Sequence, residues 1–380
     1  MRVAVAVHGR FHAFDLAAYL HGRGLLAGLV TTYPDFATRR FVPKDAPVTS
    51  AAWLEAWRRL HARLKLPGST DVFVAKAFGR FTARHLPVGA DLLVGWSAAS
   101  LEAITAAHAR GMKVVIERGS SHIVHQTEVL DREHERFDLP WRRTDQRLIE
   151  RELAEYERAD AIAVPTSYAA ETFKRRGIPA ERLIVNPYGV DLALFRPSPP
   201  RPPDTPVRIL FVGRVGVRKG VPWLLRAFAL LDARAELHLV GPVEPGMDKV
   251  LALEPMERVV VRGPLPGAQL PQEYAAADIF CLPSLEEGLP LVVLQAMASG
   301  LAVVATPETG AGDVIRDGIE GRLVPSGDPR ALAAALDALA GDPLLRSHMG
   351  DRARRAVESG LGWDDYGKRA VAAYEKLLGS

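Results

Sequence analysis

The chain has 380 residues, of which 48% are hydrophobic and 24% are charged, and its formal net charge is +3. Its length exceeds that of one ordinary domain, and its composition excludes a disordered or low-complexity protein. No apolar run is long enough for a spanning helix or a secretory leader, and Cys281 alone allows no internal disulfide, so we expect a soluble, cytoplasmic protein of two domains.

The charge is distributed unevenly along the chain. Residues 1–86 contain thirteen Lys and Arg against five Asp and Glu, a net charge of +8, which leaves −5 for the remaining residues. This asymmetry predicts an anionic partner at one end of the molecule, either a phosphate, a lipid surface or a nucleic acid.

The first half of the chain alternates short apolar runs with amphipathic stretches. The runs predict strands at 2–7, 25–31, 91–94, 113–116, 160–164 and 182–185, and several of them lack period-two alternation, as strands covered on both faces do. The stretches between them predict helices at 14–22, 98–110, 144–158 and 167–176. This alternation is typical of a parallel, doubly wound α/β sheet.

One stretch of this half is both basic and apolar. Its apolar residues recur at helical spacing, and its basic residues lie between them: Trp53, Leu54, Trp57, Leu60 and Leu64, with Arg58, Arg59, Arg63 and Lys65. Such a helix either packs on its own domain or lies in the interface of an anionic membrane. We expect it to pack on its own domain, with peripheral membrane contact as the alternative hypothesis.

A proline-rich segment divides the chain. Residues 196–206 hold six prolines, which exclude a helix interior or a central strand and predict a semi-rigid spacer: Pro197, Pro199, Pro200, Pro202, Pro203 and Pro206. A second series follows, with strands expected at 207–212, 237–240, 259–262, 279–282 and 301–305, and helices at 221–231, 291–299, 329–339 and 351–359. We therefore predict two Rossmann-like domains joined by a hinge, with ligands bound in the cleft between them.

The loop after strand 207–212 suits an anion. Gly213 and Gly216 allow a close backbone approach, and a helix that begins near Lys219 presents unpaired N–H groups. Arg214 and Lys219 add two charges that could clamp a diphosphate. A plain strand-to-helix turn with solvated basic residues is the alternative, since this loop is neither a Walker loop nor a dinucleotide fingerprint.

A second loop follows strand 279–282. It runs from Pro283 to Pro290, which suits the first turn of a helix. Glu287 then lies at the helix N-terminus, where Gly288 and Leu289 could offer amides to phosphate oxygens. Gln295 lies about a turn and a half inside the helix.

Together these loops carry a resemblance to a known family. The Gly-Arg…Lys-Gly loop, the Pro-Ser-Leu-x-Glu-Gly-Leu-Pro run and the Ala-Met-Ala-x-Gly end resemble the family 4 retaining glycosyltransferases. Asn186-Pro-Tyr-Gly-Val-Asp191 matches that family's Asn-x-x-Gly-Val-Asp pattern. The resemblance is strong over residues 160–380 and weak before them. It implies the GT-B fold, in which two Rossmann-like domains face a central cleft.

The resemblance also implies a division of labour along the chain. Residues 1–195 would form the acceptor-binding domain, 196–206 the linker and 207–362 the nucleotide-sugar-binding domain, with a last helix at 363–380 that crosses back to the first domain. The donor would be a nucleotide-diphosphate sugar, with no metal and no cofactor.

Individual roles follow from the matched positions. Arg214 and Lys219 would hold the donor diphosphate, and Glu287 would contact hydroxyls of the donor sugar. Gln295 stands where the family has a ribose-binding glutamate, which predicts altered ribose recognition, since an amide has lost the charge. The remaining donor contacts would come from loop backbone at Gly213, Gly216, Gly288, Leu289, Pro290 and Leu291.

Residues of the first domain are weaker candidates. By resemblance, His122 would lie beside the transferring sugar, although a loop histidine bonded to the backbone is an equal alternative. The loop after the first strand offers Gly9 as a cleft residue and Arg10 and His12 for the acceptor, or it is an ordinary turn. We reject a metal site at His122, His125 and Glu128, because such a spacing is common by chance.

The function implied is transfer of a sugar, with retention, to a hydroxyl of a sugar, glycan or lipid-linked acceptor, as in polysaccharide biosynthesis. The protein would act in the cytoplasm, with peripheral contact at the inner face of the membrane as the alternative hypothesis. The basic stretch lacks a nucleic-acid-binding module, so no nucleic-acid partner is expected. A sugar-nucleotide epimerase of the same fold and a non-catalytic nucleotide-sugar-binding relative are the alternatives, the second supported only by Gln295.

Overall fold

The computed structural model describes residues 1–64, 68–199, 201, 202 and 204–379. Four residues named above lie outside the described residues: Lys65 of the basic stretch, Pro200 and Pro203 of the linker, and Ser380 at the end of the last predicted helix. No helix in the described ranges is long and apolar enough to cross a membrane.

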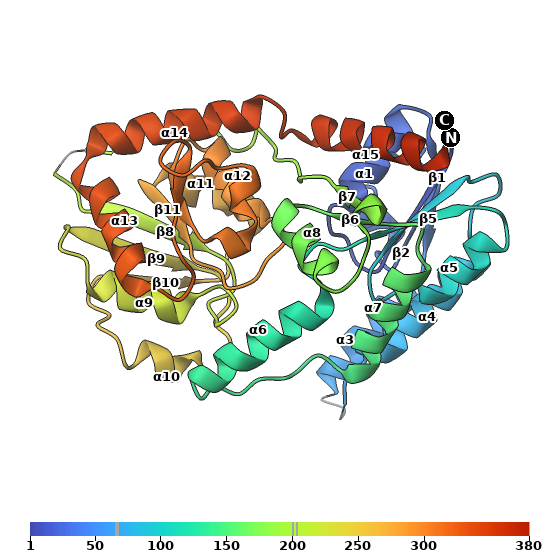
Figure 1. The fold of residues 1–380 in the computed structure, drawn as a ribbon, viewed down its shortest axis with the longest axis horizontal. Helices are drawn as coiled ribbons and strands as arrows, with labels where there is room; N and C mark the ends of the chain where they lie inside the picture. The colour runs from blue at the N-terminus through green and yellow to red at the C-terminus, as the bar shows by residue number, and fades with distance from the viewer. Residues whose placement is uncertain (65–67, 200, 203, 380) are drawn as a thin grey trace.

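The first half of the chain forms a parallel seven-stranded sheet of order β3-β2-β1-β4-β5-β6-β7, on the right in Figure 1. Its strands are β1 (Val3–Val7), β2 (Leu26–Thr31), β3 (Val48–Ser50), β4 (Leu92–Trp96), β5 (Lys113–Glu117), β6 (Ala161–Val164) and β7 (Leu183–Val185). All except β3, a short edge strand, were predicted to within two residues.

The helices of this half are α1 (Ala13–Gly22), α2 (Asp35–Thr38), α3 (Ala52–Arg63), α4 (Asp71–Arg84), α5 (Leu101–His108), α6 (Ile123–Arg136), α7 (Gln146–Arg158) and α8 (Ser167–Lys174). The predicted helices are confirmed, whereas α2, α4 and α6 were not predicted. The expectation that α3 packs its apolar stripe on its own domain is wrong. Of the predicted stripe only Leu54 is buried, whereas the other four apolar side chains are exposed.

Residues after the linker form a parallel six-stranded sheet of order β10-β9-β8-β11-β12-β13. Its strands are β8 (Val207–Val212), β9 (Ala235–Val240), β10 (Val259–Gly263), β11 (Ile279–Leu282), β12 (Ala302–Ala305) and β13 (Gly321–Leu323). Its helices are α9 (Val221–Ala229), α10 (Met247–Leu251), α11 (Leu270–Ala275), α12 (Leu291–Ala298), α13 (Pro329–Gly341) and α14 (Pro343–Glu358). Only β13, α10 and α11 were not predicted. Helix α14 begins eight residues early, because the Asp342 carboxylate caps it.

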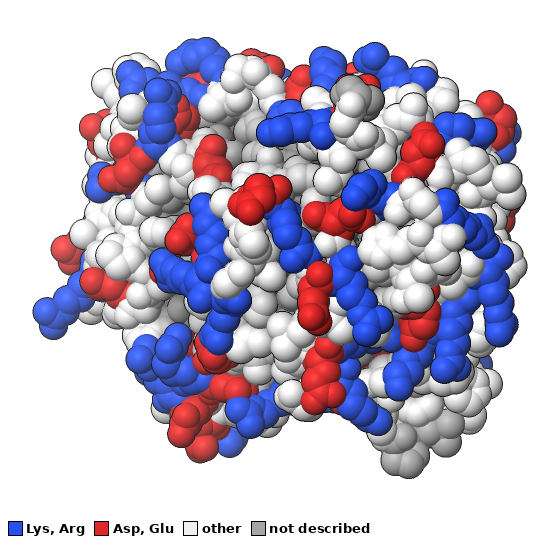
Figure 2. Space-filling view, turned by 45° about the vertical axis from the view of Figure 1, so that its right-hand side comes forward, with Lys and Arg blue, Asp and Glu red and all other residues white. Residues whose placement is uncertain are grey.

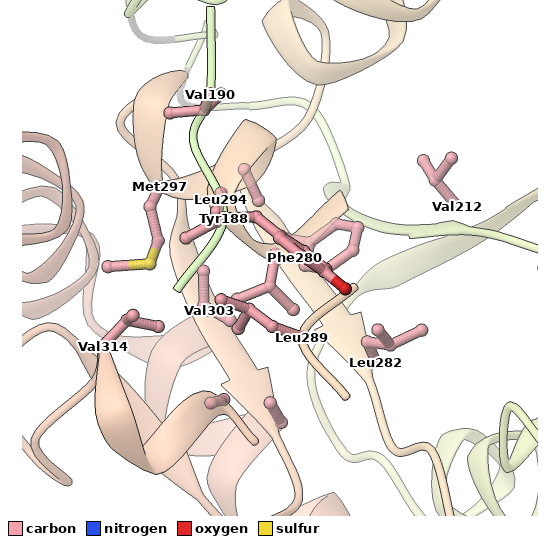
Figure 3. Close-up of a cluster of buried hydrophobic side chains, with 14 of the residues drawn as sticks. Tyr188, Val190, Val212, Phe280, Leu282, Leu289, Leu294, Met297, Val303 and Val314 are labelled. Atoms are coloured by element: carbon pink, nitrogen blue, oxygen red, sulfur yellow. The ribbon is translucent and has the colours of Figure 1, made fainter. Parts of the chain in front are cut away.

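The core of the second sheet explains its continuous apolar strands. Helix α12 lies across β11 and β12, and Figure 3 shows side chains of all three elements in one cluster that includes Phe280, Leu294, Met297 and Val303. All four are completely buried. Burial on both faces is what a strand without alternation predicts.

The last helix, α15 (Trp363–Leu378), lies against α1 of the first half, at the upper right of Figure 1. Its Gly367 lies so close to the Tyr19 ring that an added Cβ would be 2.3 Å from Tyr19 Cγ. The Tyr366 hydroxyl donates to Glu117 Oε1 at 3.2 Å, and both side chains are buried. We therefore call the first sheet, its helices and α15 the N-terminal domain, and the second sheet with α9–α14 the C-terminal domain.

In both sheets the strand order reverses at a defined place. The reversal lies between β1 and β4 in the N-terminal domain and between β8 and β11 in the C-terminal domain. Loops after strands at such a switch point form a crevice in which ligands of doubly wound folds bind.

Candidate active site

The loops at the carboxyl ends of the two sheets meet directly. The Ser120 hydroxyl, after β5, donates to Glu286 Oε1 at 2.6 Å, and the Thr166 hydroxyl, after β6, donates to the Gly288 carbonyl at 2.9 Å. An added Cβ on Gly288 would lie 2.3 Å from the Gly119 carbonyl oxygen. Glycine at 288 is thus required for the close approach of the two domains.

Lys219 and Glu287 form the centre of the candidate site. The Lys219 ammonium lies 2.6 Å from Glu287 Oε1, and the two side chains are 18% and 10% exposed. The aliphatic part of Lys219 passes over Gly213, whose φ of +155° turns the chain at the end of β8. The structure therefore brings together three predicted residues, Gly213, Lys219 and Glu287, at the switch point.

Arg214 faces a different neighbour. Its Nε lies 3.8 Å from Glu244 Oε1, and its side chain is 59% exposed, so the ion pair is weak. The Glu244 carboxylate lies over Gly216, where an added Cβ would be 1.9 Å from Oε2. A cavity of about 430 Å³ lies beside Arg214, with Trp141 and Met247 among its walls. The guanidinium is therefore accessible to an anion.

Glu286 connects the two domains, and the sequence did not single it out. Its completely buried carboxylate accepts hydrogen bonds from Ser120, from the amide and hydroxyl of Ser121 and from Gln126, and pairs with Arg218 at 2.9 Å. Burial alone would raise the pKa of this carboxyl, but the Arg218 charge and these hydrogen bonds lower the pKa to about 2. Glu286 is therefore ionised between the domains.

Helix α12 begins where the sequence predicted, and its Gln295 already has a hydrogen-bond partner within the domain. Pro290 is the residue before the first helical position, Leu291, and Leu289 is buried beside it. The Gln295 side-chain oxygen accepts a hydrogen bond from the Tyr274 hydroxyl at 3.0 Å. One lone pair of this oxygen is thus used within the domain.

A separate cavity of about 450 Å³ lies at the switch point of the N-terminal domain. Gly9 lines it with a φ of +94°, and its amide donates to the Thr32 hydroxyl at 2.9 Å. Arg10 also lines the cavity and lies over the Phe41 ring. His12 does not line it. Its buried ring packs against Trp96 and Tyr188.

His122 lies inside the N-terminal domain. Its Nδ1 accepts a hydrogen bond from the Val124 amide at the start of α6, and its ring packs against Tyr156 and Phe173 with 3% exposure. Burial and nearby arginine charges lower the pKa of His122 to about 4, so the ring is neutral at physiological pH. These contacts agree with the second of the two alternatives for His122, a histidine whose ring is hydrogen-bonded to the backbone.

The two neighbours of His122 in the rejected metal pattern have other partners. His125 Nε2 lies 3.2 Å from the Tyr168 hydroxyl, and Glu128 pairs with Arg176. In the parts of the chain that the structure describes, no three His, Cys, Asp or Glu side chains are grouped so that they could hold a metal ion.

Comparison with known proteins adds a family match for part of the chain. Residues 206–342 match the family model described as glycosyl transferases group 1. The chain is 33% identical over 238 residues to a D-inositol 3-phosphate glycosyltransferase of Xylanimonas cellulosilytica, which covers 57% of each chain. It is 32% identical over 226 residues to an MMP alpha-(1->4)-mannosyltransferase of Mycolicibacterium hassiacum, covering 58% of this chain and 54% of that one. The chain thus spans a little over half the length of these relatives.

Solved structures match the whole chain. A glycosyltransferase from Rickettsia africae has a TM-score of 0.72 at 15% identity, covering 99% of this chain and 98% of that one. Anabaena Alr3699/HepE in complex with UDP-glucose has a TM-score of 0.71 at 16% identity, covering 99% and 100%. At such low identity the likeness shows the fold alone. The chain has the GT-B fold, and its C-terminal domain carries a match to the group 1 glycosyl transferases.

Proposed function

We propose that the chain is a retaining, metal-independent glycosyltransferase that moves a sugar from a nucleotide-diphosphate sugar to an acceptor hydroxyl. The observation that carries the proposal is the contact of Lys219 with Glu287, since Lys219 shares its loop with the accessible Arg214. The group 1 glycosyl transferase match covers all three residues. Relatives that are named as glycosyltransferases support the same class of reaction.

The proposed reaction needs positive charge at the leaving group. The acceptor oxygen forms a bond to the anomeric carbon while the bond from that carbon to the diphosphate oxygen breaks. The departing diphosphate takes up the acceptor proton. Arg214 and Lys219 would stabilise the developing negative charge, helped by amide groups at the start of α9. Glu287 would bind hydroxyls of the donor sugar, and Gln295 the ribose.

The Lys219–Glu287 pair suggests how the donor enters. Without a ligand, the carboxylate neutralises the ammonium that would hold the diphosphate. A diphosphate carries more charge than one carboxylate, so we propose that it draws the ammonium toward itself. Glu287 would then be released toward the sugar hydroxyls. Binding of the diphosphate by Lys219 would thus free Glu287 to bind the sugar.

The acceptor would occupy the N-terminal domain, in the cavity beside Gly9 and Arg10. The mixed charges of its wall, from Glu55, Arg58 and Asp71, suit a polar acceptor such as a sugar, a glycan or the head of a lipid-linked sugar. We propose a cytoplasmic site of action with peripheral contact to an anionic membrane, and no nucleic-acid partner. Since His122 caps α6, we propose that it positions the Ser120–Ser121 loop rather than touching the sugar.

The test is calorimetric binding of UDP, GDP and ADP, then of their common sugar conjugates, to the wild type and to Arg214→Ala. Binding of one nucleotide that Arg214→Ala weakens, while the exposed-site control Arg352→Ala does not, would support the donor site. Product analysis of the bound donor with candidate acceptors then separates the alternatives. A new glycosidic bond of retained configuration supports transfer, and an isomerised sugar nucleotide without such a bond indicates an epimerase. Binding with no turnover indicates a non-catalytic relative.

A further inference from the structure

The outer side of α3 is an apolar stripe that the domain does not cover. Trp53, Trp57, Leu60 and Leu64 follow one another at helical spacing and are exposed by 52%, 41%, 48% and 58%. Phe73 of α4, itself 51% exposed, meets the Trp57 ring edge-on at 6.2 Å. Soluble proteins rarely leave so many large apolar side chains together in water.

Basic side chains surround this stripe. Within α3, Arg58 and Arg59 share the Glu55 carboxylate at 2.9 and 2.8 Å, so one acidic group serves two cations. Arg63 is exposed and forms no ion pair with any described carboxylate. The helix therefore carries an excess of positive charge beside its apolar stripe.

Helix α4 extends the basic surface. Lys76, Arg80 and Arg84 recur every four residues, so they lie on one face of α4, the same face as Phe73. All three are exposed, and within the described residues they form no ion pair. Figure 2 shows Lys and Arg side chains gathered over the part of the N-terminal domain that comes forward on the right. An apolar stripe next to unpaired cations is complementary to an anionic lipid surface.

The opposite side of α3 lines the cavity beside Gly9. Leu54, Glu55 and Arg58 contribute to its wall; Leu54 lies about a quarter of a turn from the centre of the stripe, Arg58 about a third and Glu55 about half. One helix thus has the candidate acceptor cavity on one side and the apolar stripe on the other.

We infer that the outer surface of α3 and α4 binds an anionic membrane, with the tryptophans at the interface and the basic row of α4 on the lipid phosphates. This places the acceptor cavity at the membrane surface. The inference rests on the proposed function only for the identity of the cavity, since the surface itself is independent of the donor site.

The test measures flotation of the full chain with vesicles of phosphatidylcholine, alone or mixed with phosphatidylglycerol, at low and physiological salt. We expect binding to the anionic vesicles that weakens with salt. Trp53→Ser/Trp57→Ser and Arg80→Gln/Arg84→Gln should each lower the bound fraction by about tenfold or more. Matched controls on the C-terminal domain, Leu253→Ser/Leu344→Ser and Arg352→Gln/Arg355→Gln, should bind like the wild type; these residues are also exposed.

Brominated lipids give a second readout, because they quench only tryptophans that enter the bilayer. Quenching in the wild type that is lost in Trp53→Ser/Trp57→Ser supports the orientation. No flotation at low salt, or equal loss in the C-terminal controls, overturns the inference. Binding of a single-stranded RNA that depends on Arg80 and Arg84, or self-association that depends on Trp53 and Trp57, also overturns it if vesicles are not bound.

Nucleotide calorimetry on the same variants separates this inference from the proposed function. Some variants are expected to lose flotation and still bind the donor like the wild type. That result would show that membrane binding and donor binding are separate properties. If no nucleotide binds while flotation persists, the proposed function fails and the membrane surface stands.

Discussion

The Lys219 ammonium and Glu287 Oε1 lie 2.6 Å apart, although the two residues come from different loops of the C-terminal sheet. Both side chains are largely shielded from water, whereas the Arg214 side chain is 59% exposed. In the unliganded protein Lys219 therefore contributes a shielded ion pair, whereas Arg214 contributes only a long, exposed one.

Substituting these cations should separate activity from stability. Arg214→Ala and Lys219→Ala should each lower kcat/KM for transfer by about 100-fold or more, since each removes a charge-assisted bond to the leaving group. Arg214→Ala should change the free energy of unfolding by less than about 0.5 kcal/mol. Lys219→Ala should cost about 1–3 kcal/mol, because Glu287 loses its nearer counterion and keeps the more distant Arg218, 3.6 Å away. Steady-state kinetics and urea unfolding measure both, with Arg352→Ala as control. Near-wild-type turnover in either variant would contradict the proposal that these two cations hold the diphosphate.

The Glu286 carboxylate should make stability depend on acid. Its pKa is about 2 in the folded protein and near 4.5 when exposed, so folding favours the ionised form. The contribution, roughly 3 kcal/mol, is present above about pH 5 and is lost as the pH falls toward 2. Urea unfolding across this range should show a steeper loss for the wild type than for Glu286→Gln. Glu171→Gln, at an exposed carboxylate, should keep the wild-type slope; equal slopes in all three proteins would contradict the assignment.

Gly288→Ala should force the two domains apart. The new Cβ would meet the backbone oxygen of Gly119 at 2.3 Å, which a side-chain rotation cannot relieve. We expect a loss of about 1–3 kcal/mol in the free energy of unfolding and a larger radius of gyration in small-angle X-ray scattering. Gly312→Ala is the matched control, because its Cβ would lie 3.8 Å from its nearest neighbour, Leu323. An unchanged scattering curve for Gly288→Ala would show that the contact does not hold the domains.

His122→Asn should preserve activity, because asparagine is also a good N-cap and can accept from the Val124 amide. His122→Ala should lose about 1 kcal/mol of stability with the cap. Since the pKa of His122 is about 4, kcat of the wild type should show no titration of this ring near pH 6.5. A loss of kcat by orders of magnitude in the stable His122→Asn protein would instead place the ring at the transferring sugar.

Features that depend on local sequence patterns, namely most strands and the two loops of the candidate site, could be predicted from the sequence. Apolar runs without alternation gave most strands to within two residues, and glycine and proline positions located the loops that hold Lys219 and Glu287. These two residues lie at the carboxyl ends of neighbouring strands, β8 and β11, so the predicted alternation of strands and helices was enough to bring them together.

Contacts between distant segments could not be predicted in this way. Glu286 is next to Glu287 in the sequence, which gives no sign that its side chain is more deeply buried. Its role depends on Ser120 and Ser121, 166 and 165 residues earlier. Helix α6 was missed because only four of its fourteen residues are apolar and because two of the residues it buries, Glu133 and His134, are polar. For α3 the period was visible, but the pattern alone does not say whether the apolar side faces the protein or the solvent.

The return of α15 to the N-terminal domain affects the order in which the protein can fold. Tyr366 and Tyr374 are buried, and the Tyr366 hydroxyl bonds to Glu117 of β5, so these late residues complete the surface of the first domain to be synthesised. While a ribosome is still making the C-terminal domain, the strands of the N-terminal sheet have been synthesised, but the face of α1 that receives Gly367 is uncovered. Final packing of the N-terminal domain must therefore follow synthesis of the C-terminal domain, and until then the nascent chain has an exposed apolar face that a chaperone could recognise.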